Sequence, residues 1–245
     1  MSRIYSEEPE LYDIAFGWDL SEEADWLVER LGPDCRRVLE PGCGSGRMLG
    51  ALAERGLEVV GLDLSPEMVA YARLRLGDAG EVVHADMTDF DLGRRFDVAV
   101  SLVSTVGLLS PEGFEAHLDA MARHLEPGAR YLMQQGVFTP DAELWRSEWD
   151  AARNGIKLHV VWEALGREGS RERSRSRVEV LAGPRAGDVV EDEHTNTFWT
   201  VDAWQEAIAG SPFTQLACYD GRQPGRPAVD LDAGGGLLWH ELVSP

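Results

Sequence analysis

The chain has almost no lysine and little positive charge. Lys157 is the only lysine, and the 23 lysine and arginine residues are outnumbered by 43 aspartates and glutamates, which gives a formal net charge of −20. Nucleic acids and anionic membranes bind proteins through electropositive surfaces, so this balance argues against both as partners.

Cysteine pairs and long apolar runs are also missing. The three cysteines, Cys35, Cys43 and Cys218, are scattered, with the spacing of neither a zinc site nor a disulfide framework. No apolar run approaches the roughly 18 residues that span a membrane, and the acidic, polar residues 1–10 do not resemble a signal peptide. We therefore predict a cytoplasmic protein with no metal, no membrane partner and no nucleic-acid partner.

The first half of the chain alternates short apolar runs with helical patterns, which predicts parallel βαβ units. The predicted strands are Arg37–Glu40, Glu58–Asp63, Glu81–His84, Phe96–Leu102 and Arg130–Gln134. The predicted helices are Glu22–Leu31 ahead of the sheet, then Gly46–Arg55, Pro66–Arg75 and Pro111–Leu125. A length of 245 residues fits one large domain, or one domain with a modest insertion.

The pattern changes after Gln135. Residues 156–164, 172–181 and 188–199 alternate with the strand period, which predicts a three-stranded antiparallel excursion from the sheet. A helix and two last strands are then predicted at Val201–Ala209, Gln215–Tyr219 and Gly236–Val243. We predict an α/β fold with a doubly wound, mostly parallel sheet and a small antiparallel β-cap.

Four regions are expected along the chain. They are an N-terminal helical lid over 1–35, a cofactor-binding core over 36–135, a β-cap with the substrate region over 136–200, and the last helix with the C-terminal β-hairpin of the core sheet over 201–245.

A glycine-rich loop follows the first predicted strand. Residues 40–46 read Glu-Pro-Gly-Cys-Gly-Ser-Gly. Glycine allows a positive φ and a close approach of backbone to ligand, and the helix start that follows favours acceptor groups. The dinucleotide fingerprint differs, because it is G-x-G-x-x-G with its acidic residue about 20 positions later. The pattern E-x-G-x-G-x-G resembles the S-adenosylmethionine loop of class I methyltransferases, where the carboxylate meets the amino-acid end of the ligand.

Polar residues also stand where the other predicted strands end, and open α/β sheets bind ligands at that edge. Asp63 ends the second strand, where a carboxylate can accept hydrogen bonds from both hydroxyls of a ribose. Asp86 and Met87 follow the third strand, where they can meet an adenine amino group and ring. Residues 101–105 follow the fourth, where methyl donor and acceptor would meet. Taken singly, Asp63 and Asp86 could each be a local cap.

Four segments look like successive motifs of class I S-adenosylmethionine-dependent methyltransferases: Val38–Leu49, Val60–Ala72, Ala85–Phe90 and Phe96–Leu109. Residues 86–93 (Asp-Met-Thr-Asp-Phe-Asp-Leu-Gly) and the stretch 100–107 are similar to segments of small-molecule N-methyltransferases, which include the macrolide amino-sugar N,N-dimethyltransferases. The resemblance covers nearly the whole chain. It implies a Rossmann-like, seven-stranded sheet and S-adenosylmethionine as cofactor, with S-adenosylhomocysteine as product.

The resemblance assigns roles to individual residues. Tyr12 matches the Tyr-Asp of an N-terminal aromatic lid that closes over cofactor and substrate, although it could be only a packing residue. The candidate cofactor-binding residues are Glu40, Gly42, Gly44, Gly46, Asp63, Leu64, Asp86, Met87 and Ser101.

A general base for the acceptor is sought among six histidines. His194 is the leading candidate, because strand alternation places it on one face with Asp192, Asn196 and Phe198. That face could instead only pack on the first sheet. His159 and Glu163 are reserve candidates, whereas the remaining histidines, His84, His117, His124 and His240, are assigned to packing or solvent.

A run of arginines at 171, 173, 175 and 177 shares one strand face. It could clamp an anionic substrate, but cross-strand pairing with Glu191 and Glu193 is the favoured interpretation.

The sequence thus predicts a methyltransferase that acts on a small molecule, favouring an amine in bacterial secondary metabolism. The alternatives are O- or C-methylation, methylation of a peptide N-terminus, a cofactor-binding protein without turnover, and a nicotinamide dehydrogenase. An open cavity beside Ser104 and His194 would favour the enzyme, and a cavity filled by Trp145, Trp149 or Trp162 would favour the silent binder. The antiparallel excursion offers a surface on which two copies could form a homodimer.

Overall fold

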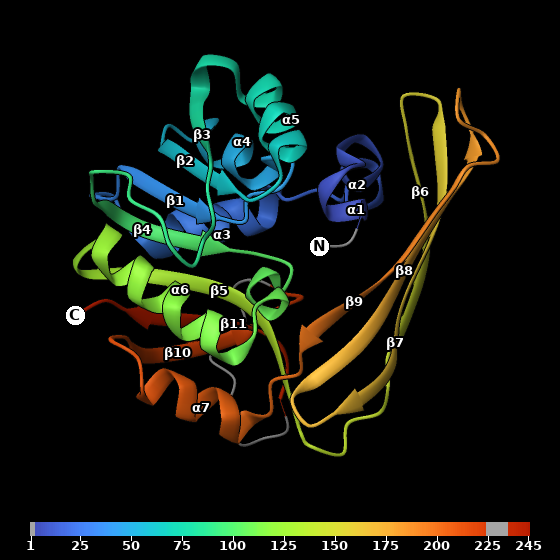
Figure 1. The fold of residues 1–245 in the computed structure, drawn as a ribbon. Coiled ribbons are helices and arrows are strands. Elements are labelled where there is room, and N and C mark those ends of the chain that lie inside the picture. The colour runs from blue at the N-terminus through green and yellow to red at the C-terminus, as the bar shows by residue number, and fades with distance from the viewer. Residues whose placement is uncertain (1–2, 224–234) are drawn as a thin grey trace.

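The computed structural model describes residues 3–223 and 235–245. Its centre is a seven-stranded sheet in the order β10-β11-β5-β4-β1-β2-β3 (Figure 1). The strands are β1 (Arg37–Pro41), β2 (Glu58–Asp63), β3 (Gly80–His84), β4 (Phe96–Ser101), β5 (Leu125–Phe138), β10 (Thr214–Asp220) and β11 (Gly235–Val243). Strands β1 to β5 pair in parallel, and β11 is antiparallel to both β5 and β10. The predicted α/β, mostly parallel sheet is therefore confirmed.

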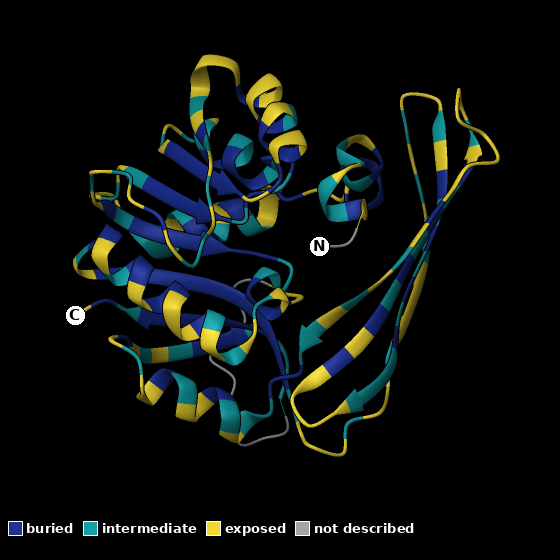
Figure 2. Ribbon diagram, in the orientation of Figure 1, coloured by how far each residue is buried: buried dark blue, intermediate teal, exposed yellow. Residues whose placement is uncertain are grey.

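Helices cover both faces of this sheet. The helical segments are α1 (Arg3–Ser6), α2 (Pro9–Ala15), α3 (Ser21–Leu31), α4 (Arg47–Ala53), α5 (Pro66–Leu76), η1 (Gly77–Ala79), η2 (Thr105–Leu108), α6 (Pro111–His124) and α7 (Val201–Ala209). Side chains of α6 and α7, such as Phe114 and Trp204, join one buried cluster, and side chains of α3 to α5 join another. Figure 2 shows the sheet buried between them. Among the described residues, every helix is too short or too polar to cross a lipid bilayer.

The predicted start of a helix at Pro66 is confirmed. The Ser65 hydroxyl accepts a hydrogen bond from the Met68 amide at 3.1 Å, and Pro66 is the first helical residue. A capping oxygen satisfies an otherwise unpaired amide of the first turn, and proline costs nothing at that position. Helix α5 is thereby fixed directly after β2, where Asp63 stands.

A second, separate sheet stands beside the core (Figure 1). It is antiparallel in the order β6-β7-β8-β9, with strands β6 (Arg146–Arg153), β7 (Ile156–Glu168), β8 (Arg171–Ala182) and β9 (Val189–Thr197). Its inner face contributes Leu158, Val160 and Val178 to a third buried cluster, together with Ile4 and Leu11 of the N-terminal helices. Helices α1 and α2 therefore link the second sheet to the core.

The predicted three-stranded excursion is wrong in one respect, because the sheet has four strands. Strand β6 pairs with β7 from Arg146↔Glu163 to Arg153↔Ile156. Its sequence, Arg-Ser-Glu-Trp-Asp-Ala-Ala-Arg, offers few apolar residues, and none of them is fully buried. An edge strand has one partner and a partly solvated inner face. Its apolar and polar residues therefore alternate too weakly for the strand to be recognised from the sequence.

One buried carboxylate connects the separate parts of the fold. Asp13 on α2 is fully buried and accepts hydrogen bonds from Ser45 of the glycine loop at 2.8 Å and from Tyr71 of α5 at 3.0 Å. It also pairs with Arg75 of α5 and with Arg153 at the end of β6. Burial alone would raise its pKa, but the hydrogen bonds from Ser45 and Arg153 and the two arginine charges lower it.

Replacement of this carboxylate should destabilise the protein strongly. In Asp13→Ala two arginines lose their shared counter-ion, and removing one partner of a buried ion pair costs about 3 kcal/mol or more. Urea unfolding followed by tryptophan fluorescence measures the loss. As a control, Asp25→Ala removes the exposed partner of Arg55 and should cost less than about 1 kcal/mol. Equal losses for the two variants would contradict the connecting role of Asp13.

Candidate active site

A cavity of about 1240 Å³ lies between the core and the second sheet. Its floor comes from the carboxyl ends of β1, β2, β4 and β5, and its opposite wall comes from β7, β8 and β9. Single small-molecule sites occupy about 300–1,000 Å³. The cavity therefore has room for a cofactor and a second ligand side by side.

The glycine loop has the backbone that the sequence predicts. Gly42 and Gly44 line the cavity with φ of 67° and 52°. A Cβ on Gly42 would lie 2.4 Å from Cγ2 of Thr105, and one on Gly44 would lie 3.4 Å from the Tyr12 ring. A side chain at Gly42 would clash with Thr105, whereas at Gly44 the positive φ and not a lack of space disfavours one.

Gly46 has a different role. It lies outside the cavity wall at the start of α4, with φ of 73°, and its Cβ would lie 3.1 Å from that of Ala72 on α5. Close packing of two helices explains this glycine, and its contact with a cofactor stays a prediction.

Asp63 and Leu64 line the cavity where β2 ends. The Asp63 carboxylate accepts hydrogen bonds from the amides of Gly44 and Ser65, each at 2.8 Å, so it holds the glycine loop as well. Burial raises its pKa above the ordinary value. Both oxygens keep a lone pair for further donors, as ribose recognition would need. Leu64 is 49% exposed, an apolar surface beside that carboxylate.

Asp86 and Met87 lie further along the same floor. One oxygen of Asp86 accepts hydrogen bonds from the amide and hydroxyl of Thr88, both at 2.8 Å, which is the local turn that the sequence left open. The Met87 carbonyl accepts a hydrogen bond from Nδ1 of His117 at 2.8 Å. Burial lowers the pKa of His117 to about 4, so the ring is neutral. His117 thus fixes the backbone at Met87.

Glu40 and Ser101 are buried outside the cavity wall. Oε2 of Glu40 is buried without a hydrogen-bond partner among the described residues. Burial raises the pKa of this carboxyl to about 8, against a lowering by the nearby Arg47. A buried polar atom without a partner costs free energy, and a ligand cation or donor would relieve that cost.

Tyr12 has the position expected of a lid residue. It lines the cavity, and its ring packs against Phe16 at 4.7 Å between centroids, over Gly44. Burial raises the pKa of its phenol to about 12. Tyr12 is therefore a neutral aromatic cover and hydrogen-bond donor, which makes it unsuitable as a base.

His194 faces the cavity from β9, together with Asn196 and Phe198 as alternation predicts. Neither ring nitrogen has a hydrogen-bond partner within the described residues. The ring packs edge-on against Tyr5 at 5.5 Å, and burial lowers its pKa, so the imidazole is neutral near pH 7. Asp192, the fourth residue of that face, instead accepts a hydrogen bond from the Arg3 amide and lies outside the wall.

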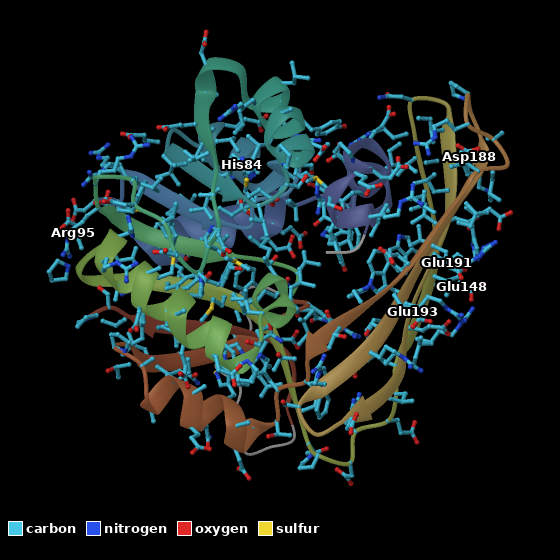
Figure 3. All side chains as sticks on the ribbon, viewed as in Figure 1. His84, Arg95, Glu148, Asp188, Glu191 and Glu193 are labelled. Atoms are coloured by element: carbon cyan, nitrogen blue, oxygen red, sulfur yellow. The ribbon has the colours of Figure 1, made fainter. Side chains whose placement is uncertain are left out.

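The reserve candidates and the arginine run belong to the outer face of the second sheet. His159 pairs with Asp150 at 2.9 Å, and Glu163 pairs with Arg146 and Arg175. The ion pairs Arg173–Glu193 and Arg177–Glu191 between β8 and β9 confirm the favoured cross-strand interpretation. Figure 3 shows Glu148 and Glu191 on the side of this sheet that faces away from the core.

Sequence reasoning missed two polar side chains of the cavity. Gln135 and Trp199 line it and are 4% and 3% exposed, yet Oε1 of Gln135 and Nε1 of Trp199 have no hydrogen-bond partner in the described parts of the chain. A signal was present, because Gln135 is polar and directly follows the strand predicted at Arg130–Gln134, and ligands of such sheets bind where the strands end. Trp199 carried no such signal.

The tryptophans do not fill the cavity. Trp145, Trp149 and Trp162 are part of its wall, and Ser104 and His194 share the remaining space with them. Ser104 and Val103 both have a positive φ, 54° and 55°. Hydrogen bonds from their amides to Gln134 hold this turn at the end of β4. Of the two alternatives, the open cavity favours the enzyme.

These residues fit S-adenosylmethionine. The glycine loop admits a close ligand, and Asp63 retains acceptor capacity for ribose hydroxyls. The unpaired Oε2 of Glu40 has the chemistry to accept from an ammonium group, and because Glu40 lies outside the cavity wall this contact stays a prediction. Met87 and Leu64 supply apolar surface for a base.

Known proteins resemble this chain in sequence and in structure. A family model described as a methyltransferase domain matches residues 38–128. The dTDP-3-amino-3,6-dideoxy-alpha-D-glucopyranose N,N-dimethyltransferase of Streptomyces fradiae is 34% identical over 82% of this chain and 82% of its own. The dTDP-3-amino-3,4,6-trideoxy-alpha-D-glucopyranose N,N-dimethyltransferase of Streptomyces venezuelae is 33% identical over 73% and 77%. The sugar N-methyltransferase KedS8 from a Streptoalloteichus species has a TM-score of 0.73 and 26% identity, covering 96% of this chain and 92% of that one.

Binding of the cofactor should release a proton from Glu40. With a pKa of about 8 the carboxyl is mostly protonated at pH 7, and a neighbouring cation would favour the carboxylate. Affinity for S-adenosylmethionine should therefore rise with pH between about 6 and 8, above which the α-ammonium group of the ligand loses its own proton. Calorimetry at pH 7 in two buffers of different ionisation enthalpy counts the proton. Glu40→Gln should abolish the release, and an unchanged proton count in that variant would contradict the assignment.

Proposed function

The chain belongs to the S-adenosylmethionine-dependent methyltransferases, and from that premise we propose that it methylates the amino group of a small sugar-containing molecule. The observation that carries the proposal is the shared cavity, where the glycine loop and Asp63 face the neutral ring of His194. The relatives from both Streptomyces species are named for N,N-dimethylation of amino sugars, which supports an amine acceptor.

S-adenosylmethionine supplies an electrophilic methyl group on a sulfonium. The amine lone pair forms the new C–N bond while the S–C bond breaks and its electron pair returns to sulfur. The acceptor nitrogen then carries one surplus proton, and the unpaired ring nitrogen of His194 is placed to accept it. Most of the acceleration comes from alignment and exclusion of water, which Tyr12 and Phe16 favour by covering the glycine loop.

The proposal is tested by incubating the protein with methyl-labelled S-adenosylmethionine and a simple 3-amino-3-deoxy-glucoside. We expect label in the sugar, located on nitrogen by fragmentation, with one and then two methyl groups. The N-acetylated glucoside is the control and should stay unlabelled, since its nitrogen lone pair is delocalised. Labelling of a hydroxyl or a carbon in either compound would contradict an amine acceptor.

Replacement of the candidate base should affect turnover and leave cofactor affinity unchanged. We expect His194→Ala to lower kcat by about 10²-fold or more, the usual contribution of a general base, and to keep S-adenosylhomocysteine affinity within about two-fold. Because burial lowers the pKa of His194, its protonation should add a decline of activity below about pH 6.5 to the decline that protonation of the acceptor amine causes. Only the part due to the histidine should vanish in the variant. His159→Ala, on the outer face of the same sheet, should behave as wild type. An unaltered pH profile in His194→Ala would show that this ring does not take the proton.

A further inference from the structure

The cavity wall carries more acidic than basic side chains. Glu23 and Glu143 stand on the wall in addition to Asp63, Asp86 and Glu172, whereas its described cations are Arg167 and Arg222. A sixth acidic residue of the wall, Glu193, pairs with Arg173. A bound diphosphate carries two or more negative charges, and proteins hold such groups with arginine clusters or helix N-termini. The cavity as described has no such cluster.

Arg167 is already engaged. Its Nε donates to Glu172 at 2.7 Å, its two terminal nitrogens donate to the carbonyls of Ala142 and Glu143, and its guanidinium lies 3.8 Å from the Phe198 ring centroid. The nearly buried Glu172 neutralises its charge. An anionic ligand would have to break this arrangement, and Arg167 therefore supports the wall rather than a phosphate.

Arg222 is the remaining described cation of the wall, and its side chain is exposed. One exposed arginine makes a weak site for a diphosphate, since exposed ion pairs contribute about 0–1 kcal/mol.

The wall is instead rich in aromatic rings. Tyr5, Phe16, Trp149 and Trp162 form one group, with centroid distances from 5.2 to 6.2 Å between Trp162 and the other three. Phe138 and Phe198 stack at 5.8 Å and 7° elsewhere on the wall. Rings of this kind bind apolar or aromatic surfaces and favour a protonated amine over an anion.

The free polar atoms of the wall are neutral. Oε1 of Gln135 is an acceptor and Nε1 of Trp199 is a donor, and both are buried without a described partner. Buried neutral groups of this kind recognise hydroxyl and amino groups, because leaving them unpaired costs about 1–3 kcal/mol each.

We propose that the acceptor is an amino sugar already attached to an apolar, uncharged scaffold, and that it carries no nucleotide diphosphate. This inference rests on the proposed amine methylation and names its substrate class. Glycosyl transfer must then precede methylation, because that is the reaction class that exchanges the nucleotide diphosphate of a sugar for a scaffold. In this respect the chain would differ from its relatives named for dTDP-sugars.

The test compares two acceptors with the same amino sugar. One is the 4-nitrophenyl 3-amino-3-deoxy-glucoside and the other is the dTDP-linked 3-amino-3-deoxy-glucose. We expect the kcat/KM of methyl transfer to be about ten-fold or more higher for the aryl glucoside, the discrimination that one aromatic contact can provide. A higher kcat/KM for the dTDP-sugar would overturn the inference and leave the proposed function intact.

A binding measurement separates the two proposals if neither sugar is methylated, which would count against amine methylation. Calorimetry with thymidine diphosphate and the S-adenosylhomocysteine complex should show no binding tighter than about 1 mM. Micromolar binding of thymidine diphosphate would overturn the inference whatever the turnover.

A charge reversal tests whether the acidic charge of the wall is what excludes a diphosphate. Glu143→Arg places a cation on the exposed rim of the cavity and should strengthen thymidine diphosphate binding by up to about five-fold, the most that an exposed ion pair contributes. Its matched control is Glu115→Arg, an equal reversal at an exposed position of α6 outside the wall, which should leave that affinity unchanged. Equal effects of the two reversals would show that the charge of the wall does not exclude the diphosphate.

Discussion

The active-site architecture depends on one buried carboxylate, Asp13. Four donors from three other segments converge on it: Ser45 of the glycine loop, Tyr71 and Arg75 of α5, and Arg153 of the second sheet. Two arginine charges and two hydroxyl donors compensate the desolvation of the Asp13 carboxylate. A buried cluster of this kind is stable only when all four donors are correctly placed around the carboxylate. These contacts fix the positions of the N-terminal helices, the glycine loop and the second sheet relative to one another. The cavity is the space that remains between them.

Much of the cofactor side could be predicted because its signals are local. Gly42 and Gly44 require positive φ, Ser65 and Pro66 mark a helix start, and Asp63 ends a strand. Parallel strands bring their carboxyl ends to one edge, so these residues meet without any knowledge of packing. The second sheet could be predicted less completely from the sequence. Strand β6 is defined by its pairing with β7 and not by its own composition.

The acceptor side could be predicted only in part for the same reason. Alternation along β9 placed His194 and Phe198 on one face. It could not show that Asp192 on that face accepts a hydrogen bond from the Arg3 amide. Gln135 comes from β5, and Trp199 comes from the segment after β9. Only the packing of the two sheets shows that both contribute to one wall. Distances between separate sheets are tertiary information that no local pattern contains.

The position of the first described residue has a practical consequence for handling the protein. The Arg3 amide donates to Asp192 of β9 at 2.7 Å, and Tyr5, two residues on, lines the cavity. Residue 245 lies on the far side of the core (Figure 1). A tag attached close to Arg3 would therefore be attached beside the cavity wall, whereas a tag attached at Pro245 would be attached away from it. Immobilisation through the C-terminal end is the orientation that keeps the enzyme accessible to bulky acceptors.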